Sequence, residues 1–121
     1  MNRHILVVED DPLVALMLEG YLDALGHTTV AVVESVAAAL AQIASRDLDA
    51  AIVDVHLASG ETSGPVADAL RAADIPFLVT TGSLTAIDDP ALAAAPLVAK
   101  PFALASLATA LAELWRAPVE D

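Results

Sequence analysis

Residues 4–17 read HILVVEDDPLVALM, and the chemistry of the side chains changes abruptly along this stretch. Ile5–Val8 is an apolar run that is too short for a helix and typical of a strand buried on both faces. Three acids come next, and the last of them, Asp11, can cap a helix that has Pro12 at its first position. The stretch therefore predicts a buried parallel strand that leads through an acidic turn into a helix.

The same succession of a short apolar run and a helical segment recurs along the rest of the chain. Apolar runs, most of them rich in valine and isoleucine, predict strands at Ile5–Val8, Thr29–Val33, Ala50–Val53, Phe77–Val79 and Pro96–Ala99. Such alternation is typical of an α/β domain whose parallel sheet is covered by helices on both faces. From a length of 121 residues we expect one domain, residues 1–121, with a (βα)5 doubly wound fold.

The segments between these runs have helical patterns of different strength. The first helix is expected to begin after Asp11 and to end near Gly26, and Ser35 can cap the second, whose inward face includes Leu40. Residues 83–95 contain many alanines, a proline and two acids without a clear apolar stripe, so we expect an irregular fourth helix or a loop there. Further helices are expected over roughly Pro65–Ala73 and Leu104–Trp115.

Charge and composition exclude several classes of function. The chain carries 17 acidic against 5 basic residues, a formal net charge of −12, which argues against binding to nucleic acid or to an anionic membrane surface. It contains no cysteine, so disulfides and zinc–thiolate sites are excluded. The N-terminal apolar run is too short for a signal peptide, and the longest uncharged stretch, Ile75–Ile87, is too short to cross a bilayer. We therefore expect a cytoplasmic protein without nucleic-acid or membrane partners.

Polar residues suited to chemistry stand where the predicted strands end. The carboxyl ends of parallel strands meet at one edge of a doubly wound sheet, and the sites of such folds lie there. Lys100 is the only lysine in the chain, so one ammonium is expected among several carboxylates. We call this edge the rim; it comprises Glu9, Asp10, Asp54, Thr81, Gly82 and Lys100.

The residue types of the rim predict a metal and phosphoryl chemistry. Carboxylates that crowd together repel one another unless a cation lies between them. Oxygen ligands without histidine or cysteine favour a hard cation, and Mg²⁺ is the natural choice. A carboxylate can also attack phosphorus to form an acyl phosphate, whose charge the metal, the hydroxyl and the ammonium would neutralise.

Taken together, Glu9-Asp10, Asp54, Thr81 and Lys100-Pro101 resemble, at this spacing, the receiver domain of two-component response regulators. The resemblance covers essentially the whole chain. It implies a flavodoxin-like sheet with strand order 2-1-3-4-5. It also implies that a histidine kinase or a phosphotransfer protein passes a phosphoryl group to this chain, which then switches its binding to an output partner.

The resemblance implies a role for each residue of the rim. Asp54 would be the phosphoacceptor, and Lys100 would pair first with Asp54 and then with the phosphate. The hydroxyl of Thr81 and the backbone N–H of Gly82 would contact phosphoryl oxygens. The Lys100–Pro101 bond is expected to be cis, which the chain tolerates before proline. Mg²⁺ would be held by Glu9, Asp10, Asp54 and the backbone carbonyl of His56.

A narrower resemblance is carried by DVHLASGETSGPVADAL, residues 54–70, and PFLVTTG, residues 76–82. They are similar to a receiver subgroup of alphaproteobacteria that has a Phe-Ala-Thr-Gly-type motif and an irregular fourth helix. This chain departs from the motif at Thr80, where the subgroup has alanine. Leu97 stands where ordinary receivers have an aromatic residue, which points to residues 83–95 as another route for the signal.

Several residues have a structural interpretation that competes with a functional one. Asp11 is favoured as a helix cap over a metal ligand, and Thr80 is favoured as a packing residue over a phosphate contact. The stretch Glu61-Thr62-Ser63 is favoured as a cap of the third helix.

Three functions remain open at this point. The first is a phosphoacceptor that catalyses its own phosphoryl transfer and hydrolysis and is otherwise not an enzyme. The second is a pseudo-receiver that binds partners without phosphorylation. The third is a Mg²⁺-dependent phosphatase with an aspartyl nucleophile, which calls for a second aspartate where this chain has His56. No DNA-binding output segment is expected in this chain, and the sequence leaves the oligomeric state open.

Overall fold

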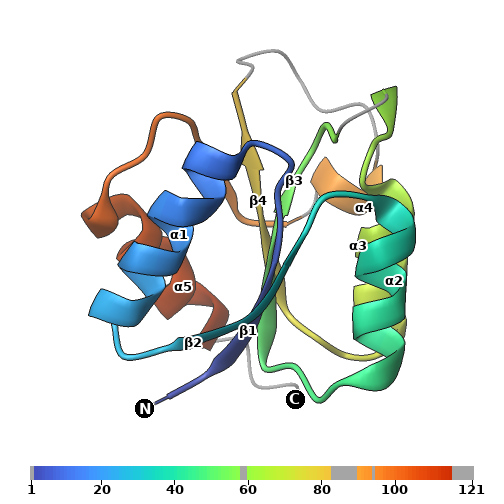
Figure 1. Ribbon diagram of the computed structural model, residues 1–121, viewed down its shortest axis with the longest axis horizontal. Helices are drawn as coiled ribbons and strands as arrows, with labels where there is room; N and C mark the ends of the chain where they lie inside the picture. Colours follow the sequence, from blue (N-terminus) through green and yellow to red (C-terminus); the bar gives the residue numbers. More distant parts are fainter. Residues whose placement is uncertain (1, 58–59, 83–89, 94, 116–121) are drawn as a thin grey trace.

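The computed structural model describes residues 2–57, 60–82, 90–93 and 95–115. Its centre is a five-stranded sheet in which every pair of neighbours is parallel and the order is β2-β1-β3-β4-β5 (Figure 1). This confirms the predicted fold class and strand order. The strands are β1 (His4–Val8), β2 (Thr28–Val33), β3 (Ala50–Asp54), β4 (Phe77–Thr81) and β5 (Leu97–Ala99).

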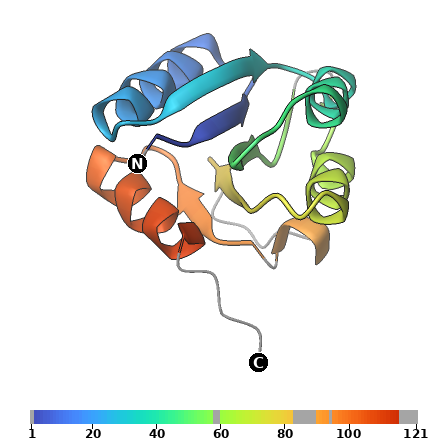
Figure 2. The ribbon, with the colours of Figure 1, turned by 90° about the horizontal axis from the view of Figure 1, so that it is seen from below.

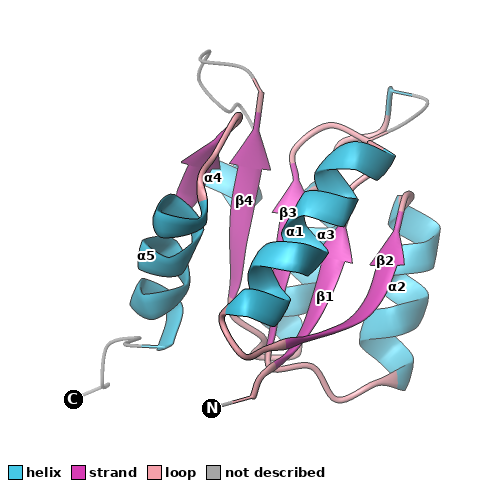
Figure 3. Ribbon diagram, turned by 60° about the vertical axis from the view of Figure 1, so that its left-hand side comes forward, coloured by secondary structure: helices cyan, strands magenta, loops and turns pink. Residues whose placement is uncertain are grey.

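Helices cover both faces of the sheet, as a doubly wound fold requires (Figures 2 and 3). One face is covered by α1 (Pro12–Ala24) and α5 (Leu104–Trp115), and the other by α2 (Val36–Ser45), α3 (Gly64–Ala72) and α4 (Pro90–Ala93). The described part of α4 is a single turn, and the rest of the predicted irregular segment, residues 83–89 and 94, lies outside the described residues.

The sheet separates two apolar clusters, which explains why the strands could be recognised as continuous apolar runs. Along β1, Leu6 and Val8 face the cluster under α2 and α3, whereas Ile5 and Val7 face the cluster under α1 and α5. All four side chains are buried. Burial of both faces removes the alternation of polar and apolar residues that marks a strand with one wet face.

The inward face of α2 differs from the prediction. Leu40 is 37% exposed, whereas its neighbour Ala39 is fully buried against the sheet. The helix therefore faces the core with Val36, Ala39 and Ile43, and Leu40 lies at the margin of the contact. Successive residues of a helix are about 100° apart around its axis, which places Leu40 at one side of the helix face that these three residues share.

The predicted helix boundaries are set by local hydrogen bonds. Asp11 has an extended backbone and its Oδ1 accepts a hydrogen bond from Leu13 N at 2.9 Å, so it caps α1 as expected. Ser35 caps α2 in the same way, with Oγ accepting from Ala38 N at 3.2 Å. Gly26 follows α1 with φ of +86°, a conformation that suits glycine. No described helix combines the length and the apolarity needed to cross a membrane.

Replacing the cap of α1 tests the structural interpretation of Asp11. We expect Asp11→Ala to lower the free energy of unfolding by about 1 kcal/mol, because Leu13 N loses its acceptor. Urea unfolding without divalent cations measures this. Glu19→Ala, an exposed position in the same helix, should stay within about 0.5 kcal/mol of the parent. An Asp11→Ala protein with parental stability but much weaker Mg²⁺ binding would instead make Asp11 a metal ligand.

Candidate functional site

The strand ends bring three carboxylates together at the rim. Glu9 and Asp10 follow β1, and Asp54 is the last residue of the neighbouring strand β3. Each offers a carboxylate oxygen, and these three oxygens all lie within 4.8 Å of one another. Glu9 is 1% exposed and Asp54 6%, whereas Asp10 is half-buried. Two of the three carboxylates are thus held close together away from solvent.

Lys100 places its ammonium between the two buried carboxylates. Its Nζ lies 2.9 Å from Oε1 of Glu9 and 3.0 Å from Oδ2 of Asp54. Its backbone N–H donates to the carbonyl of Thr81 at 2.7 Å, which fixes the end of β5 against the end of β4. The Lys100–Pro101 peptide bond is cis, as expected.

Burial and pairing set the charge states of this group. Burial raises the pKa of Glu9 above its ordinary value, and neither the backbone N–H of Asp11 nor Lys100 fully compensates. Burial acts to lower the pKa of Lys100, but the hydrogen bonds to Glu9 and Asp54 outweigh it, so that pKa is raised. Lys100 is therefore charged at neutral pH. A further cation nearby would stabilise the ionised form of Glu9.

The remaining predicted rim residues lie around this ion-paired group. Thr81 ends β4 and is 4% exposed, and Gly82 follows it at the surface. The nearest atom that a Cβ on Gly82 would meet is Cδ of Lys100, at 4.0 Å, so the missing side chain keeps the space beside Lys100 open. His56 is exposed, and its backbone pairs with Thr62 in an antiparallel bridge just beyond Asp54.

Thr80 and Leu97 make none of the ion pairs of this group. Thr80 is 1% exposed, next to Asp54 in the sheet register, and its Oγ1 has no hydrogen-bond partner within the described part of the chain. Its burial is consistent with the packing role favoured from the sequence. Leu97, which replaces an aromatic residue of ordinary receivers, lies on β5 and is 52% exposed.

The donor set of the rim fits a hard divalent cation. Glu9, Asp10 and Asp54 present oxygen only, which Mg²⁺ prefers. Burial is the main reason that the pKa of Glu9 is raised even with Lys100 beside it. A divalent ion held by these oxygens would add positive charge that favours the ionised carboxylates.

Ser63 and Glu61, which lie near the rim, make other contacts than the sequence predicted. Ser63 occupies the N-cap position of α3, but its side chain makes no capping hydrogen bond, and Glu61 accepts from Val36 N of α2 at 3.1 Å. The expected cap of α3 is therefore wrong. The ψ of Ser63 is 19° rather than extended, so its backbone lacks the usual N-cap conformation, and its hydroxyl donates to the carbonyl of Asp54 instead.

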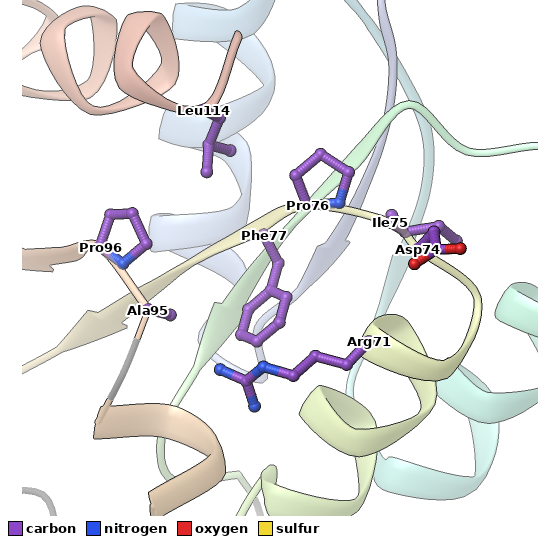
Figure 4. A pocket seen from close by; sticks show the side chains of 8 residues that line it. All are labelled: Arg71, Asp74, Ile75, Pro76, Phe77, Ala95, Pro96 and Leu114. Carbon is purple, nitrogen blue, oxygen red and sulfur yellow. The ribbon is translucent and has the colours of Figure 1, made fainter. Parts of the chain in front are cut away.

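A cavity of about 440 Å³ lies at the other end of β4 and β5 (Figure 4). Its lining is mostly apolar, and its charged members are Arg71 and Asp74. The guanidinium carbon of Arg71 lies 5.0 Å from the centroid of the Phe77 ring, so this charge is engaged by a cation–π contact. The rim, rather than this cavity, gathers the residues suited to chemistry.

Known proteins share this fold and this sequence pattern. The family model of the response regulator receiver domain matches residues 5–112. The solution structure of SdrG from Sphingomonas melonis Fr1 is 47% identical, with a TM-score of 0.85, and the match covers 93% of this chain and 96% of that one. The BeF3-activated conformation of SdrG from Pseudomonas melonis Fr1 is 48% identical, with a TM-score of 0.80, covering 92% of this chain and 94% of that one.

A more distant neighbour shares the fold. It is the receiver domain of the PhyR response regulator from Erythrobacter litoralis, 23% identical with a TM-score of 0.83, and the match covers 99% of this chain and 97% of that one. A search of curated proteins gave no match. Receiver domains are signalling modules of two-component systems that bind Mg²⁺ at an acidic site, and this chain has its acidic cluster at the rim. The chain belongs to the response regulator receiver domain family.

Proposed function

We propose that this receiver domain accepts a phosphoryl group on the carboxylate of Asp54 and thereby switches its binding to a partner. The observation that carries the proposal is the ammonium of Lys100 held between Glu9 and Asp54, with Asp10 beside them. Asp54 is buried and is the last residue of the central strand β3, at the carboxyl end of the sheet where the sites of such folds lie. A lone buried carboxylate at a strand end is costly unless it is paired.

In this proposal a carboxylate oxygen of Asp54 attacks phosphorus in a phosphohistidine of the donor protein. The new bond joins phosphorus to that oxygen, and the bond between phosphorus and the histidine nitrogen breaks. The histidine keeps the electron pair and takes up a proton. Lys100 stays within reach of the transferred oxygens, and the hydroxyl of Thr81 and the N–H of Gly82 supply further hydrogen bonds.

The proposed metal site uses Glu9, Asp10, Asp54 and the backbone carbonyl of His56. Mg²⁺ bound there would neutralise part of the charge on the phosphoryl oxygens. Water would then hydrolyse the acyl phosphate in the same site, which returns Asp54 and releases inorganic phosphate. Neither step makes the domain an enzyme that acts on other substrates.

The relatives support this proposal. SdrG, 48% identical to this chain, has been described in a BeF3-activated conformation. A trifluoride of beryllium bound to a carboxylate oxygen has the tetrahedral shape and the charge of a phosphoryl group. The donor is a histidine kinase or a phosphotransfer protein, and the output partner is another protein rather than nucleic acid.

Acetyl phosphate tests the proposal without a cognate kinase. Incubated with acetyl phosphate and Mg²⁺, the intact protein should gain the mass of one phosphoryl group, and the gain should vanish with excess EDTA. Intact-mass spectrometry measures both. No gain would favour a module that binds partners without phosphorylation. Sustained turnover of varied phosphate esters would favour a phosphatase.

A further inference from the structure

Residues 55–57, which follow Asp54, pair with residues 61–63, which precede α3. Leu57 N donates to the carbonyl of Glu61 at 2.9 Å, and Ser63 N donates to the carbonyl of Val55 at 3.1 Å. Between these two bonds, His56 pairs with Thr62. Residues 55–57 and 61–63 thus pair as the two strands of a short hairpin do, and we call these two stretches the hairpin; the first of them carries the His56 carbonyl.

Ser63 fastens the base of this hairpin. It is fully buried, and its Oγ donates to the carbonyl of Asp54 while lying 3.1 Å from the carbonyl of Val55. If the bond to the Asp54 carbonyl were broken, that buried carbonyl and the buried hydroxyl would each lose a hydrogen-bond partner. The bond consequently holds the backbone of Asp54 and Val55 in one position relative to the start of α3.

Glu61 fastens the hairpin to another part of the fold. Its Oε1 accepts from Val36 N, the first backbone N–H of α2, at 3.1 Å. A carboxylate at this place is favoured twice, because the N–H lacks a partner within the helix and the helix N-terminus is positive. Ser35 caps the same turn, so the hairpin is anchored on a helix end that is itself ordered.

We propose that Ser63 and Glu61 are positioning residues, which hold the backbone from Asp54 to His56 so that the His56 carbonyl and the Asp54 carboxylate face the same divalent cation. This inference rests on the proposed function, because it assumes the metal site of the rim. Mg²⁺ demands near-ideal octahedral geometry. Both β1 and β3 are paired on both sides, so Glu9, Asp10 and Asp54 directly follow or end well-held strands. His56 lies two residues beyond β3, where its backbone pairs with Thr62 of the hairpin.

The test compares Mg²⁺ affinity across matched variants by titration calorimetry of the whole chain. Glu61→Ala and Ser63→Ala should weaken Mg²⁺ binding by about 10-fold, the lower end of effects seen when the partners of metal ligands are removed. Glu61→Gln keeps an oxygen acceptor for Val36 N and should bind Mg²⁺ within about 3-fold of the parent. Glu34→Ala removes an equal charge from an exposed acid just before Ser35 and should also bind like the parent.

Several outcomes would overturn the inference. One is a Mg²⁺ affinity of Glu61→Ala equal to that of the parent. Another is a loss of Mg²⁺ affinity in Glu61→Gln as large as that in Glu61→Ala, because the charge of Glu61 rather than its hydrogen bond would then matter. Urea unfolding of each variant in EDTA shows whether it is folded, independently of its Mg²⁺ affinity. If Ser63→Ala does not fold, the Mg²⁺ affinity of Glu61→Ala alone tests the inference. A parent that binds no Mg²⁺ would also reject it.

The proposed function and this inference fail in different ways. A parent protein that binds Mg²⁺ but gains no phosphoryl group contradicts the proposed function, while a weaker Mg²⁺ affinity in Glu61→Ala still supports the positioning role. A parent that is phosphorylated together with a Glu61→Ala variant of unchanged Mg²⁺ affinity contradicts the positioning role alone.

Discussion

Asp54→Asn is expected to abolish the mass gain from acetyl phosphate and Mg²⁺. Asparagine keeps the size of the side chain and an oxygen that can accept from Lys100, which lies 3.0 Å from Asp54 Oδ2. The amide oxygen lacks the negative charge that makes a carboxylate a nucleophile. The substitution also removes one of the three rim carboxylates, so Mg²⁺ binding should weaken as well.

Asp49→Asn is the matched control for this experiment. Asp49 is exposed and lies just before β3, at the opposite end of the strand, where it accepts from His4 N at 2.7 Å. It should gain a phosphoryl group like the parent. A gain that persists in Asp54→Asn and maps to another residue by peptide mass spectrometry would move the acceptor away from Asp54.

Lys100→Met is expected to lower the free energy of unfolding by about 3 kcal/mol at pH 8 without Mg²⁺. Removing one member of a buried ion pair leaves the other uncompensated, at a cost of about 3–5 kcal/mol. The lower end applies because the Lys100 side chain is 19% exposed, whereas that of Glu9 is 1% exposed. Methionine fills similar volume, so loss of packing is small.

The loss in Lys100→Met should depend on pH, because Lys100 acts to lower the pKa of Glu9, which burial raises. Without the ammonium, that pKa rises further above its ordinary value of 4.5. A carboxyl whose folded-state pKa is raised favours folding while it is protonated. Its contribution is complete below the unfolded-state pKa and is lost as pH rises through the folded-state value. The variant should therefore recover stability as pH is lowered from 8 to 5.

Urea unfolding at pH 5 and pH 8 measures this difference. Arg46→Met removes a cation from an exposed position and should change the free energy of unfolding by less than about 0.5 kcal/mol at either pH. Mg²⁺ should restore part of the stability of Lys100→Met, because it supplies positive charge to the same carboxylates. An equal loss at both pH values would show that Glu9 does not depend on Lys100.

The fold was predictable because its central strands β1, β3 and β4 are buried on both faces. Ile5–Val8 and Ala50–Val53 stand out as apolar runs since α1 and α5 cover one face and α2 and α3 the other. Once the fold was predicted, the location of the rim could be predicted too, because the carboxyl ends of parallel strands lie together. Even the cis bond before Pro101 was expected from the family resemblance.

The errors concern contacts that depend on tertiary packing. Leu40 was assigned to the inward face of α2 because it is large and apolar, but Ala39 is the residue of α2 that is fully buried. Glu61 and Ser63 were assigned to the start of α3 because they precede it in the chain. Their partners are the first N–H of α2 and the last carbonyl of β3, which no local pattern reveals.

The position of Lys100 on the last strand has a consequence for the order in which the chain is made. Lys100 emerges from the ribosome 46 residues after Asp54, a delay of roughly 2–9 s at about 5–20 residues per second. During that interval the nascent chain holds Glu9, Asp10 and Asp54 without their ammonium. Close burial of these acids is unfavourable until β5 docks beside β4. Because Lys100 directly follows β5, the rim gains its ammonium only when the last strand joins the sheet.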